Sequence, residues 1–286
     1  MFLFYKKLHT MKDNLIFLFT FLVLYSCTPS SDRLLKQALK DEQKQNYSSA
    51  EQKYLTIIVK YSTSDVVPEA KYRLGMLYKD IFKDYYQAQL WFSKIVDEHK
   101  DSKFYKLAQV GLLESPDYLG IIDGNKITLG DIESLGKNMR FVVEYKKLDV
   151  DLYIGSTKLY AAERIIRQYT KFYYKDGNEI KESDVNLKTE KTDKYTIILK
   201  LPIQKNNSWS TEKENKIVIY KVFDTNLRLK TKKGFIFENC IKIMEQNKGE
   251  KGVRFLYYAP NKGCVKITTT NISELYKEYT TMELVD

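Results

Sequence analysis

The sequence has few of the residues from which catalytic centres are usually built. It contains two histidines, His9 and His99, and these are too few for a histidine-rich metal site. It has no glycine-rich phosphate loop, no HExxH motif and no CxxC motif. A serine nucleophile needs a neighbouring base, and His99 lies in a stretch with a helical repeat pattern. We therefore expect no catalytic residues, no metal and no cofactor, in a protein that is not an enzyme.

Carboxylates are abundant, with 37 aspartates and glutamates. A catalytic pair, in which one carboxylate is the general acid and another the general base, remains an alternative, because a sequence does not show which side chains meet in space. We expect nearly all of the aspartates and glutamates to be solvated charges on the protein surface.

The chain also lacks a basic block, although its net charge is +10. A strongly basic balance can indicate an anionic partner such as nucleic acid or lipid headgroups. Here lysine greatly outnumbers arginine, the lysines are scattered, and asparagine, isoleucine and tyrosine are also frequent. These residues have AT-rich codons, so a genome bias explains the excess. We expect no nucleic-acid partner.

No apolar run is long enough to span a bilayer. The longest, Leu15 to Tyr25, has eleven residues, whereas a spanning helix needs about 20. Its length matches the apolar core of a secretory signal, and Lys12 supplies the positive charge in front. Met11 is the better start of such a signal than Met1. Plain secretion and an uncleaved membrane helix are the alternatives.

The end of this run, Leu24-Tyr25-Ser26-Cys27, resembles a bacterial lipobox. Tyr25 departs from the small residue usual at its position. The resemblance implies a signal peptide over residues 1–27 and a diacylglyceryl group on Cys27, which anchors the protein to a membrane. The next residue, Thr28, is not an aspartate and so permits delivery to the outer membrane. We expect a lipid-anchored protein of the cell envelope, on the outer membrane and facing the periplasm.

Residues 28–115 contain a helical pattern that repeats after 38 residues. Tyr47, Ala50 and Tyr54 align with Tyr85, Ala88 and Phe92, at spacings of three and four that place each set on one helical face. Five helices are predicted, at about 33–45, 47–61, 67–82, 84–99 and 103–114.

These residues resemble the tetratricopeptide repeats of BamD-like and YbgF-like outer-membrane proteins. The match includes Asn46-Tyr47-x-x-Ala50 and Pro68-Glu69-Ala70, but the proline that ends each repeat in that family is missing. The resemblance implies an α–α superhelix and another envelope protein as partner. Tyr72 and Tyr78, on the inner helix, are the candidate partner-binding residues; most other aromatic residues are expected to fill the core.

After a connector at 116–138, the region 139–286 reads as a β-rich domain. A short helix is expected within 128–135. Alternating β-branched and aromatic residues then predict antiparallel strands at 139–147, 150–160, 163–175, 184–190, 194–201, 216–224, 226–232, 235–245, 252–259, 263–271 and 276–285. The fold class predicted for the chain is α+β, a tetratricopeptide-like superhelix followed by an antiparallel sheet.

Two cysteines, Cys240 and Cys264, lie in this β-rich region. The strand register places them on either side of a common neighbouring strand, about 9–10 Å apart, whereas a disulfide needs Cα atoms within about 7 Å. Two separate buried thiols are favoured, and a disulfide remains the alternative. The segment Tyr257-Tyr258-Ala259-Pro260 to Lys266 is similar to the ending of many extracytoplasmic β-domains, and Gly263 in it should allow two strands to approach closely.

Two functions compete. The first is a scaffold that binds an envelope protein through the repeats, in outer-membrane assembly or envelope maintenance. The alternative is a carrier that holds a lipid or other apolar ligand in a curved sheet, like LolA. A carrier requires a cavity of several hundred Å³ lined by apolar residues, whereas a scaffold requires a filled β core.

Overall fold

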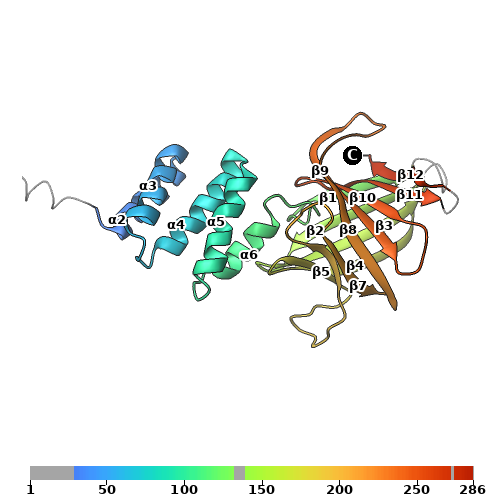
Figure 1. Cartoon of the computed structure of the whole chain (residues 1–286), viewed down its shortest axis with the longest axis horizontal. Coiled ribbons are helices and arrows are strands. Elements are labelled where there is room, and N and C mark those ends of the chain that lie inside the picture. The colour runs from blue at the N-terminus through green and yellow to red at the C-terminus, as the bar shows by residue number, and fades with distance from the viewer. Residues whose placement is uncertain (1–28, 132–138, 272–273, 286) are drawn as a thin grey trace, which may run out of the picture. The chain divides into compact units, whose positions relative to one another are not determined.

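The computed structural model describes residues 29–131, 139–271 and 274–285 of the chain (Figure 1). The apolar run and the lipobox cysteine Cys27 lie outside the described residues. The chain divides into two compact units, of which the first ends at Leu74 and the second begins at Gly75. Within the described ranges, no helix is both long enough and apolar enough to cross a membrane.

The first unit is formed by α2 (Ser31–Gln43), α3 (Tyr47–Lys60) and most of α4 (Val67–Met76). The hydroxyl of Ser30 accepts a hydrogen bond from the backbone N–H of Arg33 at 3.3 Å and caps α2. Small and large apolar residues at helical spacing form the buried faces: Leu34, Leu35, Ala38, Ala50, Tyr54, Ile57, Ala70 and Leu74.

The second unit begins with the last residues of α4 and continues through a π-helix, η1 (Leu77–Phe82), then α5 (Tyr85–Glu98) and α6 (Tyr105–Leu113). Phe92 on α5 is fully buried between two glycines. A Cβ on Gly75 would lie 2.7 Å from its ring, and a Cβ on Gly111 would lie 2.8 Å from it. Both positions therefore need a residue without a side chain.

The predicted tetratricopeptide superhelix, and with it the resemblance to BamD-like proteins, is wrong. The described residues form five α-helices of 9 to 14 residues, and they are divided between two units at a boundary inside α4. α4 continues as a π-helix, and α6 packs on a β-strand. The repeated spacing identified buried helix faces correctly, but such faces pack equally well against a sheet. The scaffold function inferred from the repeats loses its basis.

The chain is mainly β, because its second unit contains one antiparallel sheet of twelve strands. The sheet order is β6-β5-β4-β3-β2-β1-β12-β11-β10-β9-β8-β7, and the strands curve into a near-closed barrel (Figure 1). The strands are β1 (Lys126–Asp131), β2 (Met139–Lys147), β3 (Leu152–Ala161), β4 (Arg164–Asp176), β5 (Glu179–Ser183), β6 (Thr196–Lys200), β7 (Ser208–Lys213), β8 (Lys216–Lys230), β9 (Ile236–Asn247), β10 (Arg254–Ala259), β11 (Gly263–Asn271) and β12 (Glu274–Leu284).

Two local predictions in this region are also wrong. Residues 126–131 form strand β1, where the start of a short helix was expected, and residues 184–190 form turns where a strand was expected. The β1 segment pairs with β2 and β12 on its two sides, so sheet pairing overrides the local pattern.

The two end strands of the sheet meet through side chains. The indole N–H of Trp209 on β7 donates to the carbonyl of Ile197 on β6 at 2.9 Å. The Thr211 hydroxyl accepts from the N–H of Ile197 at 3.1 Å, and the Thr196 hydroxyl donates to the Glu212 carbonyl at 3.3 Å. These bonds occupy edge groups that are otherwise left unpaired, and they close the barrel where the backbone ladder stops.

The barrel interior is a packed core. Inward residues of seven strands, β3 to β9, form one buried cluster with Leu113 of α6 and with Leu119 and Ile121 of the segment that follows α6. Residues from the chain in front of the sheet thus fill one end of the barrel. A second cluster contains Ile127, Leu129, Cys240, Ala259, Val265 and Leu284.

Both described cysteines are free thiols, as the strand register favoured. Cys240 on β9 and Cys264 on β11 flank β10, since Tyr258 of β10 pairs with Cys264 on one side and with Ile241 on the other. Burial raises the pKa of the Cys240 thiol to about 11 and that of Cys264 to about 12. Cys240 is buried and Cys264 is partly buried, and both thiols stay protonated at neutral pH.

Replacing Gly111 by alanine should destabilise the second unit, because the new methyl group overlaps the ring of Phe92 and Gly75 blocks retreat on the other side. Overpacking costs about 1–3 kcal/mol, and better helix propensity returns up to about 1 kcal/mol. We expect a net loss of about 1–2 kcal/mol in the free energy of unfolding, measured by chemical denaturation. Gly252→Ala, with its nearest neighbour at 3.9 Å, is the matched control. A Gly111→Ala protein as stable as the parent would contradict this packing.

Candidate ligand-binding groove

The segment that joins α6 to β1 crosses the end of the barrel, and we call residues 114–121 the plug segment. Leu119 and Ile121 of the plug segment are buried in the barrel core. Its conformation is set by Asp117, whose Oδ1 accepts hydrogen bonds from the N–H groups of Leu119 at 3.0 Å and Gly120 at 2.9 Å. This arrangement is typical of an aspartate that organises a turn.

The plug segment is fastened to the turn between β10 and β11. The N–H of Asp117 donates to Asn261 Oδ1 at 3.0 Å, and the N–H of Asn261 donates to the Asp117 carbonyl at 2.8 Å. Gly120 and Gly263 both have positive φ, and a Cβ on either would lie within 2.8 Å of the other segment's backbone. Gly263 therefore allows a close approach, but to the plug segment and not to a second strand.

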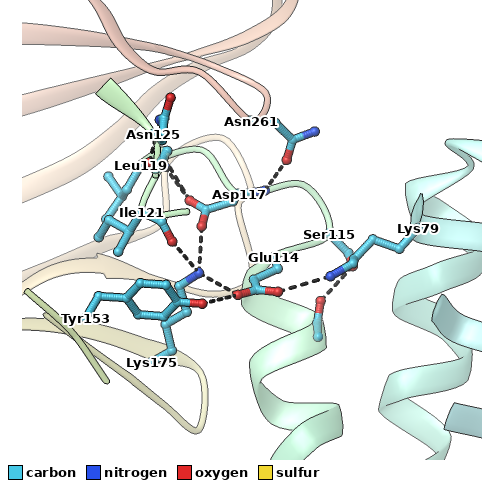
Figure 2. A network of polar contacts seen from close by, with 12 residues as sticks. Lys79, Glu114, Ser115, Asp117, Leu119, Ile121, Asn125, Tyr153, Lys175 and Asn261 are labelled. Carbon is cyan, nitrogen blue, oxygen red and sulfur yellow. Dashed lines mark hydrogen bonds and ion pairs between the residues drawn. The ribbon is translucent and has the colours of Figure 1, made fainter. Parts of the chain in front are cut away.

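Lys175 on β4 holds the plug segment from inside the barrel (Figure 2). Its side chain is fully buried, and its ammonium donates to Glu114 Oε1 at 2.7 Å, Asp117 Oδ2 at 2.7 Å and the Ile121 carbonyl at 2.9 Å. An ammonium has three hydrogens, so all its donors are used. One β-strand side chain thereby binds the end of α6 and both ends of the plug turn.

Glu114 connects the same network to the helices (Figure 2). Tyr153 on β3 donates to its Oε1 at 3.0 Å, and Lys79 on η1 donates to its Oε2 at 3.0 Å. Burial alone would raise the pKa of Glu114, but Lys175 and Lys79 outweigh burial and hold it at about 2. Two lysines balance two carboxylates, so the cluster is neutral and internally paired. It joins helices, plug segment and sheet.

A groove of about 1250 Å³ opens beside the plug segment, within the second unit. Its walls come from η1, α5, α6, the plug segment, the β6–β7 loop, the β8–β9 hairpin and the β10–β11 turn. More than half of the lining residues are apolar or aromatic, among them Phe82, Tyr86, Leu112, Tyr118, Ile203 and Phe237. The charged residues of the lining are Lys83, Asp84, Glu238 and Lys262, which balance in sign. Ligand pockets commonly enclose about 300–1,000 Å³, so the groove has room for a small molecule.

Two smaller cavities are less suited to an apolar ligand. One, of about 390 Å³, is lined largely by charged and polar residues that include Lys79, Glu114 and Asp123. The other lies inside the barrel, has about 230 Å³ and contains Glu182, Glu245 and Arg254 besides its apolar lining. Among the described residues, this internal cavity is smaller than the space that a hollow carrier barrel usually offers its ligand.

The predicted partner-binding tyrosines do not line the groove. Tyr72 lies on α4 in the first unit, and Tyr78 lies on η1 in the second, where its ring contacts Phe82 at a centroid distance of 5.5 Å. Their role in binding stays a prediction. Glu114 and Asp117 are brought together by their shared ion pairs with Lys175. Across the described ranges, no cluster of histidine, cysteine, aspartate and glutamate side chains could hold a metal ion.

Sequence reasoning missed both the groove and the network. The groove residues come from at least seven segments between Phe82 and Lys262, and the network begins at Lys79. No local spacing connects these segments. One local signal is Asp123-Gly124-Asn125 in the connector, a sequence typical of a turn. Asn125 Nδ2 donates to the Gly120 carbonyl at 2.7 Å.

The depressed pKa of Glu114 predicts a loss of stability in acid. A carboxyl whose pKa is lower in the folded chain stabilises it above the unfolded value of 4.5, and that stability is lost as the pH falls from 4.5 toward about 2. The shift corresponds to about 3 kcal/mol. The free energy of unfolding, measured by chemical denaturation at pH 7 and pH 3, should therefore fall less with acid in Glu114→Gln than in the parent chain. The control is Glu163→Gln, whose side chain is 90% exposed. Identical pH dependence in all three proteins would contradict the assignment.

No family model and no curated protein matches the chain. Two solved structures are similar to it over 59% of its length. One is a Bacteroides fragilis protein inferred to be exported, with a YmcC-like fold; it is 12% identical, with a TM-score of 0.39 and 99% of that protein covered. The other is a Parabacteroides distasonis protein inferred to be a lipoprotein; it is 14% identical, with a TM-score of 0.37 and 98% of that protein covered.

Proposed function

We propose that this chain is a lipid-anchored protein of the bacterial cell envelope that binds an elongated apolar ligand, such as a lipid acyl chain, in the groove beside the plug segment. The observation that carries the proposal is the groove itself: about 1250 Å³, open to solvent and lined mostly by apolar and aromatic residues. Apolar lining with a few polar groups at the rim is typical of small-molecule sites.

The position of the groove supports one of two kinds of carrier. In a hollow carrier the ligand lies inside the curved sheet, but here Leu113, Leu119 and Ile121 fill the end of the barrel. The space that remains lies outside the plug segment, between the helices of the second unit and the barrel rim. A ligand there would contact Leu112 on one wall and Phe237 on the other. The groove is thus the better candidate for the ligand site.

The role we propose is binding without catalysis. The polar groups next to the groove that could perform acid–base chemistry, Glu114 and Asp117, accept hydrogen bonds from Lys175, and Glu114 also binds Lys79 and Tyr153. A general acid or base must reach a substrate proton, and these carboxylates already face their own lysines. Their arrangement supports a structural role beside a ligand site.

The envelope location rests on the lipobox. The run from Leu15 to Tyr25, apolar except for Thr20 and ending in Leu24-Tyr25-Ser26-Cys27, fits export and lipidation at Cys27. Two or three acyl chains on one residue hold a protein firmly to a membrane, whereas one chain binds only marginally. The residue after the cysteine, Thr28, supports the outer membrane, on its periplasmic face.

The groove is tested by titrating the full chain with a fluorescent long-chain fatty acid. We expect saturable binding, and we expect Leu112→Trp, which fills the groove from α6, to weaken it about tenfold, or about 1.4 kcal/mol. Ile217→Trp is the control, because Ile217 is exposed at the start of β8 and does not line the groove. Circular dichroism establishes that both variants fold. Absence of saturable binding, or equal binding by both variants, would refute the proposal.

The anchor is tested separately in cells. Cys27→Ala removes the residue that accepts the diacylglyceryl group, so the precursor should accumulate unprocessed, as seen by its mobility on a denaturing gel. The parent chain should be processed and should partition into the detergent phase. Normal processing of the variant, with loss of detergent partitioning, would indicate ordinary secretion.

A further inference from the structure

The cavity of about 390 Å³, which we call the polar cavity, adjoins the apolar groove within the second unit. Two residues line both spaces: Lys83, directly after η1, and Tyr85, at the start of α5. In the plug segment, residues 115–116 line the groove, whereas the flanking residues Glu114 and Asp117 line the polar cavity. The two spaces therefore lie side by side and share a wall.

A tight turn between η1 and α5 places Lys83 and Tyr85 at this wall. Lys83 has a φ of +56°, in the left-handed region that residues with a Cβ seldom adopt. The N–H of Asp84 then donates to the Tyr78 carbonyl at 2.9 Å, and Asp84 Oδ1 accepts from the N–H of Gln87 at 3.0 Å and caps α5. These bonds fix the backbone of the two residues that line both spaces.

The hydroxyl of Tyr85 is a hydrogen-bond donor at the boundary. Asn261 Oδ1 accepts from the N–H of Asp117 at 3.0 Å (Figure 2), so its amide nitrogen is the atom that faces Tyr85. This Nδ2 donates to the Tyr85 oxygen at 2.6 Å. A phenol has one hydrogen of its own, and within the described ranges no acceptor takes it from Tyr85. The hydroxyl is therefore able to donate to an oxygen of a ligand that extends from one space into the other.

The polar cavity offers a ligand charges of both signs, from Lys83, Lys147 and Asp123. The Lys147 ammonium lies 5.6 Å from the ring centroid of Tyr153, which also lines the cavity. Asp123 Oδ1 accepts the backbone N–H of Lys147 at 2.8 Å. Among the described residues these three charged side chains form no ion pair, whereas the Glu114 carboxylate is bound by two lysines. Two ammonium groups and one carboxylate are thus available.

We propose that the ligand of the groove is a zwitterionic lipid, whose headgroup carries a phosphate and an amine and lies in the polar cavity. The inference rests on the proposed function, because the acyl chain occupies the groove. The phosphate pairs with Lys83 and Lys147 and accepts from Tyr85, and the amine faces Asp123. Phosphate and amine together match both signs of the cavity. A fatty acid has no group for the carboxylate, and an uncharged glyceride has none for the lysines.

The size of the polar cavity agrees with such a headgroup. A water molecule takes up about 30 Å³, so a cavity of about 390 Å³ has room for a head of roughly ten non-hydrogen atoms. Phosphoethanolamine is within this limit. The polar cavity therefore matches this headgroup in size as well as in charge.

The headgroup is tested on the full chain by displacement of the fluorescent fatty acid that probes the groove. Three lipids with the same palmitoyl chain are compared: lysophosphatidylethanolamine, lysophosphatidylglycerol, which has a phosphate but no amine, and uncharged monopalmitoylglycerol. The Kd of the probe is measured first for each protein. We expect lysophosphatidylglycerol to bind about fivefold tighter than monopalmitoylglycerol, and the ethanolamine lipid about twofold tighter again, because each solvent-accessible ion pair contributes little. Glycerol 3-phosphate, which has no chain, should not compete.

Two variants separate the two charges of the head. Lys83→Gln combined with Lys147→Gln should remove the advantage of lysophosphatidylglycerol over monopalmitoylglycerol. Asp123→Asn keeps an acceptor for the backbone but loses the charge, so it should remove the difference between the two phosphate lipids. Lys248→Gln combined with Lys251→Gln is the matched control, because both lysines are exposed in the β9–β10 turn and line neither space. This control should keep the order of the parent chain.

Equal affinity for the three lipids in a chain that binds the fatty acid would overturn the headgroup and leave the groove as the acyl site. Tighter binding of lysophosphatidylglycerol than of the ethanolamine lipid would overturn it too, as would loss of the order in the control. A chain that does not bind the fatty acid would refute the groove and the headgroup together. Binding of the probe therefore tells the two failures apart.

Discussion

The second unit depends on the buried ammonium of Lys175. Burial of an unpaired charge costs several kcal/mol, and at this position the cost is offset by two carboxylates and one carbonyl within 2.9 Å. The acceptors belong to the end of α6 and to the plug segment, whereas the lysine belongs to β4. Removing either side would leave an uncompensated charge in the interior, so helices, plug segment and sheet are energetically one structure.

This interaction also determines where a ligand can bind. By fixing Asp117 and Ile121, Lys175 holds Leu119 and Ile121 in the barrel core. These residues occupy much of the barrel core, and an internal cavity of about 230 Å³ between described residues contains charged side chains. The larger space of about 1250 Å³ lies on the other side of the plug segment. The same ion pairs that stabilise the barrel therefore move the candidate site from its interior to its rim.

Local sequence patterns predicted strands better than they predicted the way elements assemble. The alternation at 139–147 matches β2, and the register that placed Cys240 and Cys264 beside a common strand agrees with the pairing of β9, β10 and β11. The repeat at Ala50 and Ala88 identified buried helix faces, but helical spacing does not tell whether the face meets a helix or a strand. Lys175 was one of many lysines, and only the folded chain brings it to Glu114 and Asp117. A site built from segments between Phe82 and Lys262 has no signal in any short window.

The basic excess of the chain shows why position matters more than composition. Codon bias explains why lysines are frequent, and it led to the expectation that they are scattered. Along the sequence, Lys230, Lys232 and Lys233 are separated by other residues, but the hairpin turn at Gly234 gathers them at one tip beside Phe235 and Ile236.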